Sequence, residues 1–182
     1  MNLWHDIPCG KNAPNEINVI IEIPEGSLNK YEIDKETGLF TLDRVNYSAA
    51  TYPCEYAFAP QTLWDDGDAI DVLVFATTPI ERGTLVKVRP IGLMHMNDSG
   101  ESDDKIIAVP VNDKRQEDIQ DISDISNHKK REIAHFFETY KELKGESGEY
   151  PVIIDGFKGK DTAIAAIEKS IVNYNEKFGK KE

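Results

Sequence analysis

The sequence contains little that points to secretion, a membrane or redox chemistry. Only Cys9 and Cys54 are cysteines among its 182 residues, and they form neither a CxxC pair nor a metal-ligand spacing. No apolar run approaches the ~18 residues that a membrane-spanning helix requires. The first residues also lack the basic and then apolar layout of a signal peptide. We therefore expect two small buried thiols, no membrane partner and a cytoplasmic location.

Basic residues are in the minority. The chain has 21 Lys and Arg residues against 33 Asp and Glu residues, which gives a net charge of −12. This balance argues against nucleic acid as a partner, because such a partner requires a basic surface. A surplus of carboxylates usually serves only solubility, but many of them cluster here in two short segments, 65–71 and 98–104. We therefore expect the chemistry of the protein in these two segments.

The length of the chain fits a single domain, 1–182, which can bury roughly 70% of the surface that its unfolded state exposes. Strand-like runs rich in β-branched residues dominate the first two thirds. They lie at 18–23, 30–33, 39–44, 70–76, 85–96, 105–111 and 150–154. Polar turn residues that end in Gly38 indicate a β-hairpin between the second and third runs.

Two late helices are predicted from apolar residues at three- and four-residue spacing. The first has the apolar stripe Ile133, Phe136, Phe137, Tyr140 and Leu143. The second is capped by Asp161 or Thr162 and has the stripe Ile164, Ile167, Ile171, Tyr174 and Phe178. Strands first and helices late indicate an α+β domain, and the short strands are compatible with a small barrel.

The first acidic segment places four carboxylates directly before an apolar strand, in the order Asp65-Asp66-Gly67-Asp68-Ala69-Ile70-Asp71. Like charges packed this closely cost stability unless cations intervene. Hard oxygen ligands without a nearby His or Cys favour Mg²⁺, Mn²⁺ or Ca²⁺ over zinc. An EF-hand is excluded, because a loop that starts at Asp66 has Asp71 where Gly is required and Thr77 where Glu is required. A solvated acidic turn stays open as the alternative.

The second acidic segment runs from Asp98 to Lys105 between two predicted strands. By itself it has the composition of a surface loop. Two loops at one end of a sheet can share several cations, and Lys105 can neutralise a nearby anion. The second acidic segment therefore supports a metal site because it occurs together with the first one.

Cationic and phenolic residues are spread through the remaining elements. Lys30 and Glu32 share one face of a strand, since residues two apart do so, and Glu22 lies opposite the apolar face of its own strand. Arg44 follows Asp43 at the end of the hairpin. Further members of the set are Tyr52 and Tyr56 in an extended or turn segment, Tyr140 and Lys141. Each also fits a purely structural role, as do the four histidines, which show no ligand spacing: His5, His95, His128 and His135.

Taken together and in order, these residues resemble the soluble family I inorganic pyrophosphatases of the bacterial type, over roughly residues 5–175. The landmarks are Ile21-Glu22-Ile23-Pro24, Lys30-Tyr31-Glu32-Ile33-Asp34, Asp43-Arg44, Tyr52-Pro53-Cys54-Glu55-Tyr56, Asp66-Gly67-Asp68-Ala69-Ile70-Asp71-Val72, Arg89-Pro90-Ile91-Gly92, Asp98 to Lys105, Ala108-Val109-Pro110 and His135 to Lys141. Two positions depart from the family pattern: Ala69 stands where Pro or Glu is usual, and Asp104 follows Asp103 directly. We expect Ala69 to alter the flexibility of its loop and to leave the chemistry intact.

The resemblance implies a closed, five-stranded, antiparallel, OB-like β-barrel with two main C-terminal helices packed outside. It also implies Mg²⁺-dependent hydrolysis of pyrophosphate to two orthophosphates, with three or four Mg²⁺ ions per site and Mn²⁺ or Zn²⁺ as substitutes. The resemblance further implies a homohexamer with His135 at a subunit contact.

The resemblance further assigns roles to individual residues. The direct metal ligands are Asp66, Asp68, Asp71, Asp98 and Asp103. Glu22 and Glu32 hold metal-bound waters or a further metal. Phosphate is bound by Lys30, Glu32, Arg44, Tyr56, Lys105, Tyr140 and Lys141. The catalytic set is Asp68, Tyr56, Arg44 and Lys30, in which Asp68 accepts the proton of the attacking water and Tyr56 lies close to that water.

Two competing functions stay open. One is another two-metal phosphohydrolase that acts on nucleotides or phosphomonoesters, although no segment indicates a surface for a base or sugar. The other is a non-catalytic calcium-binding module, which leaves Lys30, Arg44 and Lys141 without a purpose. Metal-dependent turnover of pyrophosphate discriminates among them.

Overall fold

The computed structural model describes residues 1–34, 37–146, 149 and 151–179. Its strands are β1 (Ile17–Ile23), β2 (Asn29–Ile33), β3 (Phe40–Val45), β4 (Glu55–Phe58), β5 (Asp71–Val74), β6 (Leu85–Asp98), β7 (Glu101–Ser102), β8 (Lys105–Pro110) and β9 (Val152–Gly159). Its helices are α1 (Asn127–Thr139) and α2 (Lys160–Phe178), with short 3-10 turns η1 (Lys114–Gln116), η2 (Ile122–Asp124) and η3 (Glu142–Lys144). None of the helices described here is long and apolar enough to cross a membrane. The α+β class is confirmed.

Five strands form a ring. The pairings run β1–β4–β5–β8–β6 and return from β6 to β1. β9 and the short β7 extend this sheet by pairing with β6. The prediction of an entirely antiparallel sheet is wrong, because β5 and β8 pair in parallel, with Asp71 opposite Lys105. Both strands therefore begin at the same end of the ring, and their first residues are neighbours.

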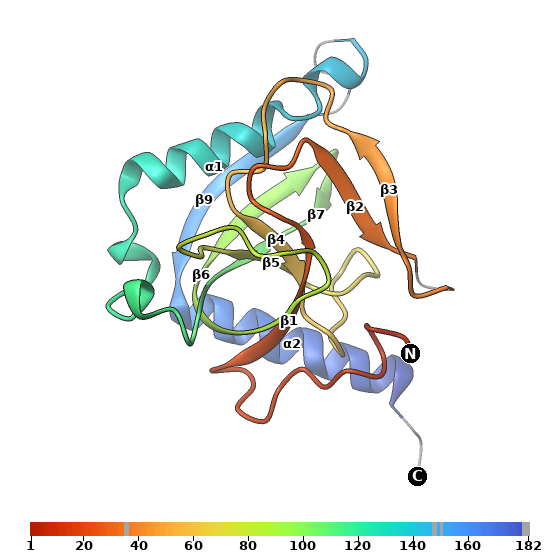
Figure 1. The fold of residues 1–182 in the computed structure, drawn as a ribbon, viewed down its shortest axis with the longest axis vertical. Helices are drawn as coiled ribbons and strands as arrows, with labels where there is room; N and C mark the ends of the chain where they lie inside the picture. The colour runs from red at the N-terminus through yellow and green to blue at the C-terminus, as the bar shows by residue number, and fades with distance from the viewer. Residues whose placement is uncertain (35–36, 147–148, 150, 180–182) are drawn as a thin grey trace.

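The hairpin β2–β3 is a separate two-stranded sheet that stands beside the ring (Figure 1). Its register places Lys30 opposite Arg44. Directly paired residues of an antiparallel sheet project to the same face. Backbone pairing therefore places the two cations of the hairpin side by side.

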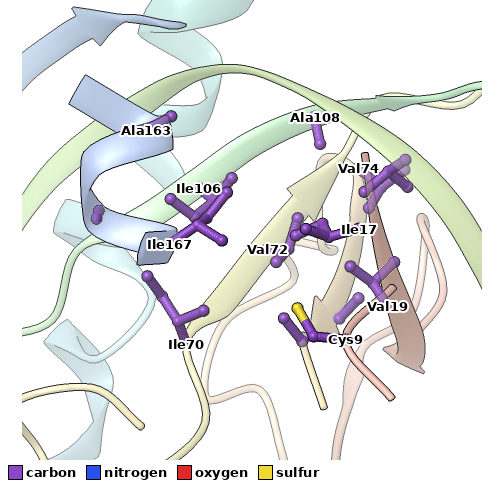
Figure 2. Close-up of a cluster of buried hydrophobic side chains, with 14 of the residues drawn as sticks. Cys9, Ile17, Val19, Ile70, Val72, Val74, Ile106, Ala108, Ala163 and Ile167 are labelled. Atoms are coloured by element: carbon purple, nitrogen blue, oxygen red, sulfur yellow. The ribbon is translucent and has the colours of Figure 1, made fainter. Parts of the chain in front are cut away.

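The core beneath the ring is built from alternate strand residues and one face of α2. Ile17, Val72 and Ile106 are fully buried there, and Ala163 and Ile167 of α2 pack against them. Figure 2 shows Ile167 next to Ile106 in this cluster. Burying one such isoleucine contributes about 1.5–3 kcal/mol. The acidic end of the ring is therefore supported by a rigid apolar layer.

Helix α1 lies along β9 on another side of the ring (Figure 1). The side chain of Ser126 caps its start by accepting a hydrogen bond of 3.2 Å from the backbone of Lys129. Phe136 and Phe137 bury its apolar face in a second core cluster. The helix ends at Thr139, which fixes the place of the two functional candidates that follow it.

Several local predictions need correction. Leu143 does not continue the stripe of α1, because it lies in η3 and is 66% exposed. The cap of α2 is Gly159, without a side-chain hydrogen bond, so the predicted caps at Asp161 and Thr162 are wrong. β4 includes Glu55 and Tyr56 of the segment predicted as extended or turn, and β9 continues to Gly159, beyond the predicted end of the last strand at Ile154. Tyr150, the predicted start of the last strand, lies outside the described residues.

Candidate functional site

A cavity of about 350 Å³ lies between the β2–β3 hairpin and the acidic end of the ring. Residues far apart in the sequence meet in its wall. Every predicted site residue except Lys105 lines it: Glu22, Lys30, Glu32, Arg44, Tyr56, Asp66, Asp68, Asp71, Asp98, Asp103, Tyr140 and Lys141. The fold therefore gathers the proposed metal and phosphate groups in one place.

Lys105 lies beneath the cavity wall, with a side chain that is 1% exposed. Its Nζ is 2.6 Å from Oδ2 of Asp71 and also contacts Oδ1 of Asp103. Burial lowers the pKa of Lys105, but the two carboxylates outweigh burial and hold that pKa above its usual value. The structure thus gives Lys105 a contact with carboxylates, whereas its predicted contact with phosphate stays a prediction.

A single oxygen of Asp71 accepts hydrogen bonds from two side chains. Besides the lysine, the hydroxyl of Tyr56 donates a hydrogen bond of 2.5 Å to the same Oδ2 atom. Burial, followed by repulsion from Asp71, raises the pKa of Tyr56 well above its usual value. The phenol therefore stays protonated at neutral pH and acts as a donor.

The other carboxylates of this wall are crowded and partly desolvated. Burial and the charge of Asp71 raise the pKa of Glu22 to about 8. Burial raises the pKa of Asp103 to about 6 against the opposing charge of Lys105. Burial also raises the pKa of Asp66. Such a cluster gains stability from added cations, since these restore the charged form of each carboxylate.

The donor chemistry of the cavity fits magnesium. All of its acidic groups are carboxylates, which are the hard oxygen ligands that Mg²⁺ prefers. Over the described part of the chain, no three His, Cys, Asp or Glu residues already converge on one point. The carboxylates of Asp98 and Asp103 contact Lys141 and Lys105 instead. The ligand types of this cavity therefore fit Mg²⁺.

The hairpin supplies the cationic wall. Nζ of Lys30 contacts Glu32 and lies 3.2 Å from Oδ2 of Asp43. Nη1 of Arg44 donates a hydrogen bond of 2.6 Å to the same Asp43 oxygen. Within the described residues, the buried Nε of Arg44 has no hydrogen-bond partner. Arg44 therefore has donor capacity that no protein acceptor among the described residues uses at Nε.

The end of α1 completes the cationic wall. Tyr140 is buried, and burial raises its pKa above its usual value. The guanidinium carbon of Arg44 lies 5.8 Å from the centroid of the Tyr140 ring. Lys141 contacts the carboxylate of Asp98, which also lines the cavity. Groups from β3, α1 and β6 are thereby linked around one opening.

Two acidic residues of the clusters lie away from the cavity. Asp104 accepts a hydrogen bond of 3.1 Å from the backbone of Met96 and lies 2.8 Å from Nδ1 of His95. Asp65 lies 2.7 Å from Nζ of Lys169 on α2. Neither lines the cavity. The structure therefore separates Asp103 from Asp104 and Asp68 from Asp65.

The sequence analysis missed several residues that also line the cavity: Trp4, Phe58, Glu101 and Ser102. The last two belong to the second acidic segment, so their spacing within it was a signal. Trp4 and Phe58 pack in an apolar cluster with Tyr174 of α2, and no local pattern relates them to the site. Buried Glu55 was also missed, and it binds the backbone N–H groups of Glu25 and Ile80 at 2.9 and 2.8 Å.

Carboxylates on one side of the cavity face fixed cations and the phenol of Tyr140 on the other. This is the arrangement of proteins that bind a polyanion together with metal cations. The chain belongs to the inorganic pyrophosphatase family, whose model matches residues 19–175. It is 48% identical over 160 residues to the inorganic pyrophosphatase of Geobacillus stearothermophilus, covering 88% of this chain and 94% of that protein.

Further relatives agree with this result. A soluble inorganic pyrophosphatase of Chlamydomonas reinhardtii is 44% identical over 175 residues, which is 96% of this chain and 89% of that protein. The crystal structure of inorganic pyrophosphatase from Thermus thermophilus superimposes with a TM-score of 0.91 at 41% identity. That match covers 96% of this chain and 99% of the Thermus chain.

Proposed function

We propose that this cavity hydrolyses inorganic pyrophosphate to two orthophosphates with Mg²⁺ as the cofactor. The observation that carries the proposal is the single cavity in which the carboxylate wall faces Lys30, Arg44 and Lys141. Membership of the inorganic pyrophosphatase family supports the choice of substrate.

Binding of the substrate falls to the cationic wall. Arg44 presents a planar fork that grips two phosphate oxygens, and the two lysines act as point charges. Tyr56 and Tyr140 stay protonated and donate hydrogen bonds, and Glu32 orients Lys30. In the absence of substrate, Lys30 pairs with Glu32 and Asp43, and Lys141 pairs with Asp98. These lysines exchange carboxylate partners for phosphate oxygens when metal ions occupy the acidic wall.

The residues that would hold Mg²⁺ are Asp66, Asp68, Asp71, Asp98 and Asp103 as direct ligands, with Glu22 and Glu32 holding its waters or a further ion. When bound, Mg²⁺ neutralises phosphate charge and lowers the pKa of water. We also propose that each site binds three to four ions and that Mn²⁺ or Zn²⁺ can substitute for Mg²⁺.

In the reaction, Asp68 accepts a proton from the attacking water, and Tyr56 orients that water. The water oxygen forms a bond to one phosphorus as the bridging P–O bond breaks in line. The departing phosphate takes the bonding electron pair, and its charge is offset by Lys30, Arg44 and Lys141. One water is consumed and two orthophosphates leave.

The wider organisation of the protein is part of the same proposal. The ring of five strands forms an OB-like barrel with the site at its mouth, within a single domain over residues 1–182. The protein works in the cytoplasm as a homohexamer, in which the exposed His135 of α1 lies at a subunit contact.

Phosphate release from pyrophosphate and from ATP, measured in parallel with Mg²⁺, tests this function. We expect rapid, Mg²⁺-dependent release from pyrophosphate and little from ATP, because no surface for a base was identified in the sequence. A preference for ATP would indicate a nucleotide phosphohydrolase. Metal binding without turnover of either substrate would indicate a calcium-binding module.

A further inference from the structure

The β2–β3 hairpin carries Lys30 and Arg44 but shares no strand pairing with the ring among the described residues. One link to the ring is a hydrogen bond of 3.0 Å from the backbone of Ile33 to the buried carboxylate of Glu22. Ile33 and Phe40 of the hairpin also pack against an apolar cluster that includes Ile20 of β1. Strand pairing with the ring therefore does not set the position of the hairpin. Contacts made by its side chains must contribute to the alignment of the phosphate-binding wall.

Arg82 makes such a contact from outside the hairpin. Its guanidinium carbon lies 3.8 Å from the centroid of the Tyr31 ring and 5.7 Å from that of the Phe40 ring. Tyr31 belongs to β2 and Phe40 to β3. A cation at this distance from an aromatic face is attracted by the ring quadrupole. One side chain therefore touches both strands of the hairpin.

The turn that carries Arg82 is fixed to the ring. The backbone of Gly83 donates a hydrogen bond of 2.8 Å to Ile21 of β1, and Ile21 donates one of 3.1 Å to Thr84. Gly83 has a positive φ of 85°, and a Cβ there would lie 3.4 Å from Phe40. The turn thus requires glycine and lies against the hairpin.

Buried Glu55 strengthens the same link. One of its carboxylate oxygens accepts from Ile80, which leads into the turn with Arg82. The other accepts from Glu25, which leads into β2. Both segments that meet at the hairpin are therefore anchored to one carboxylate of β4 that is 0% exposed.

The position of Tyr31 in β2 connects this contact to the cavity. Tyr31 lies between Lys30 and Glu32, and all three residues line the cavity. Arg82 itself does not line the cavity. We propose that Arg82, acting through Tyr31, is a positioning residue that holds the hairpin so that Lys30 and Arg44 are aligned for pyrophosphate. This inference rests on the proposed function.

The test compares Arg82→Ala with the wild type in Mg²⁺-dependent pyrophosphate turnover. We expect KM to rise and kcat/KM to fall about two- to fivefold, the size of an exposed cation–π contact, with an unchanged Tm. Arg82→Lys, which keeps a cation over the ring, should recover part of this loss. The matched control is Lys87→Ala, which removes an exposed cation of β6, a strand that does not pair with the hairpin among the described residues.

A double-mutant cycle separates positioning from simple charge. In a Tyr31→Ala background, Arg82→Ala should have little further effect, because its partner is already absent. Equal losses for Lys87→Ala and Arg82→Ala, or fully additive effects of Arg82→Ala and Tyr31→Ala, would overturn the inference. So would unchanged kinetics of Arg82→Ala in an active wild-type background.

Hydrogen exchange provides a readout that is independent of turnover. In Arg82→Ala, amides of residues 29–34 and 40–45 should exchange faster, and those of β6 and β8 should not change. Unchanged exchange in the hairpin would overturn the inference whatever the enzyme does. A wild type that fails to hydrolyse pyrophosphate while its Arg82→Ala variant shows faster hairpin exchange would overturn the proposed function alone.

Discussion

Nζ of Lys105 lies 2.6 Å from Oδ2 of Asp71, and its register partner across the parallel pair β5–β8 is that same aspartate. The lysine is buried beneath the cavity, where it also contacts Asp103. The backbone pairing therefore brings a cation to the centre of the acidic wall. This cation offsets part of the repulsion among the carboxylates of the wall.

Replacing this lysine should destabilise the metal-free protein. Lys105→Met preserves an unbranched side chain of similar length but leaves Asp71 and Asp103 without their buried counter-charge. Removing one partner of a buried ion pair costs about 3–5 kcal/mol. Thermal and urea unfolding in EDTA should show this loss, and added Mg²⁺ should restore part of it by binding the folded state. An unchanged midpoint in EDTA would show that the pair contributes nothing to stability.

The shape of the Arg44 guanidinium should matter as well as its charge. Arg44→Lys keeps the cation but loses the planar fork that binds two phosphate oxygens. We expect kcat/KM for pyrophosphate to fall at least tenfold, which corresponds to about 1.4 kcal/mol of transition-state stabilisation. Steady-state kinetics with Mg²⁺ measure it. An unaltered kcat/KM would leave Arg44 with a structural role, in its contact with Asp43.

Calcium should inhibit the enzyme. Mg²⁺ takes octahedral coordination at about 2.0–2.1 Å, whereas Ca²⁺ binds at about 2.3–2.6 Å with looser geometry. Ca²⁺ can therefore occupy the carboxylate wall while the water that loses its proton to Asp68 is misplaced. We expect competition between the two ions in a titration of phosphate release. Turnover with Ca²⁺ alone at the rate seen with Mg²⁺ would contradict this account.

Local patterns were sufficient to predict most elements, whereas the candidate site residues that line the cavity were predicted from the resemblance to the family. β-branched runs indicated β1, β6 and β8, and apolar spacing indicated both helices. β4 was not predicted as a strand, since four residues after a proline give a weak local signal. The parallel pairing of β5 with β8 depends on the packing of the whole sheet, which no local pattern reports.

Within the site, the alternating direction of side chains along a strand separates neighbouring residues of the same type. Asp103 and Lys105 are two apart and meet at the cavity, while Asp104 between them bonds to β6. This difference was available from the sequence, because the segment leads directly into β8. The contact of Arg82 with Tyr31 was not available, since it joins two segments about 50 residues apart with no pattern in common.

The pair Asp65 and Asp68 offers a matched comparison within one acidic run. Asp68 lines the cavity, whereas Asp65 pairs with exposed Lys169 outside it. A solvated acidic turn would make the two equivalent. The proposed mechanism makes only Asp68 a metal ligand and proton acceptor, and general-base roles are worth typically 10²–10⁴-fold.

The most direct test of the account is therefore the kcat for pyrophosphate hydrolysis of Asp68→Asn and Asp65→Asn at saturating Mg²⁺ and neutral pH. Circular dichroism of both variants checks that they remain folded. We predict that Asp68→Asn lowers kcat at least a hundredfold and that Asp65→Asn stays within about a fewfold of the wild type, as expected for an exposed ion pair. Comparable losses at both positions, or an Asp68→Asn variant with normal kcat, would contradict the assignment of this cavity and of its proton acceptor.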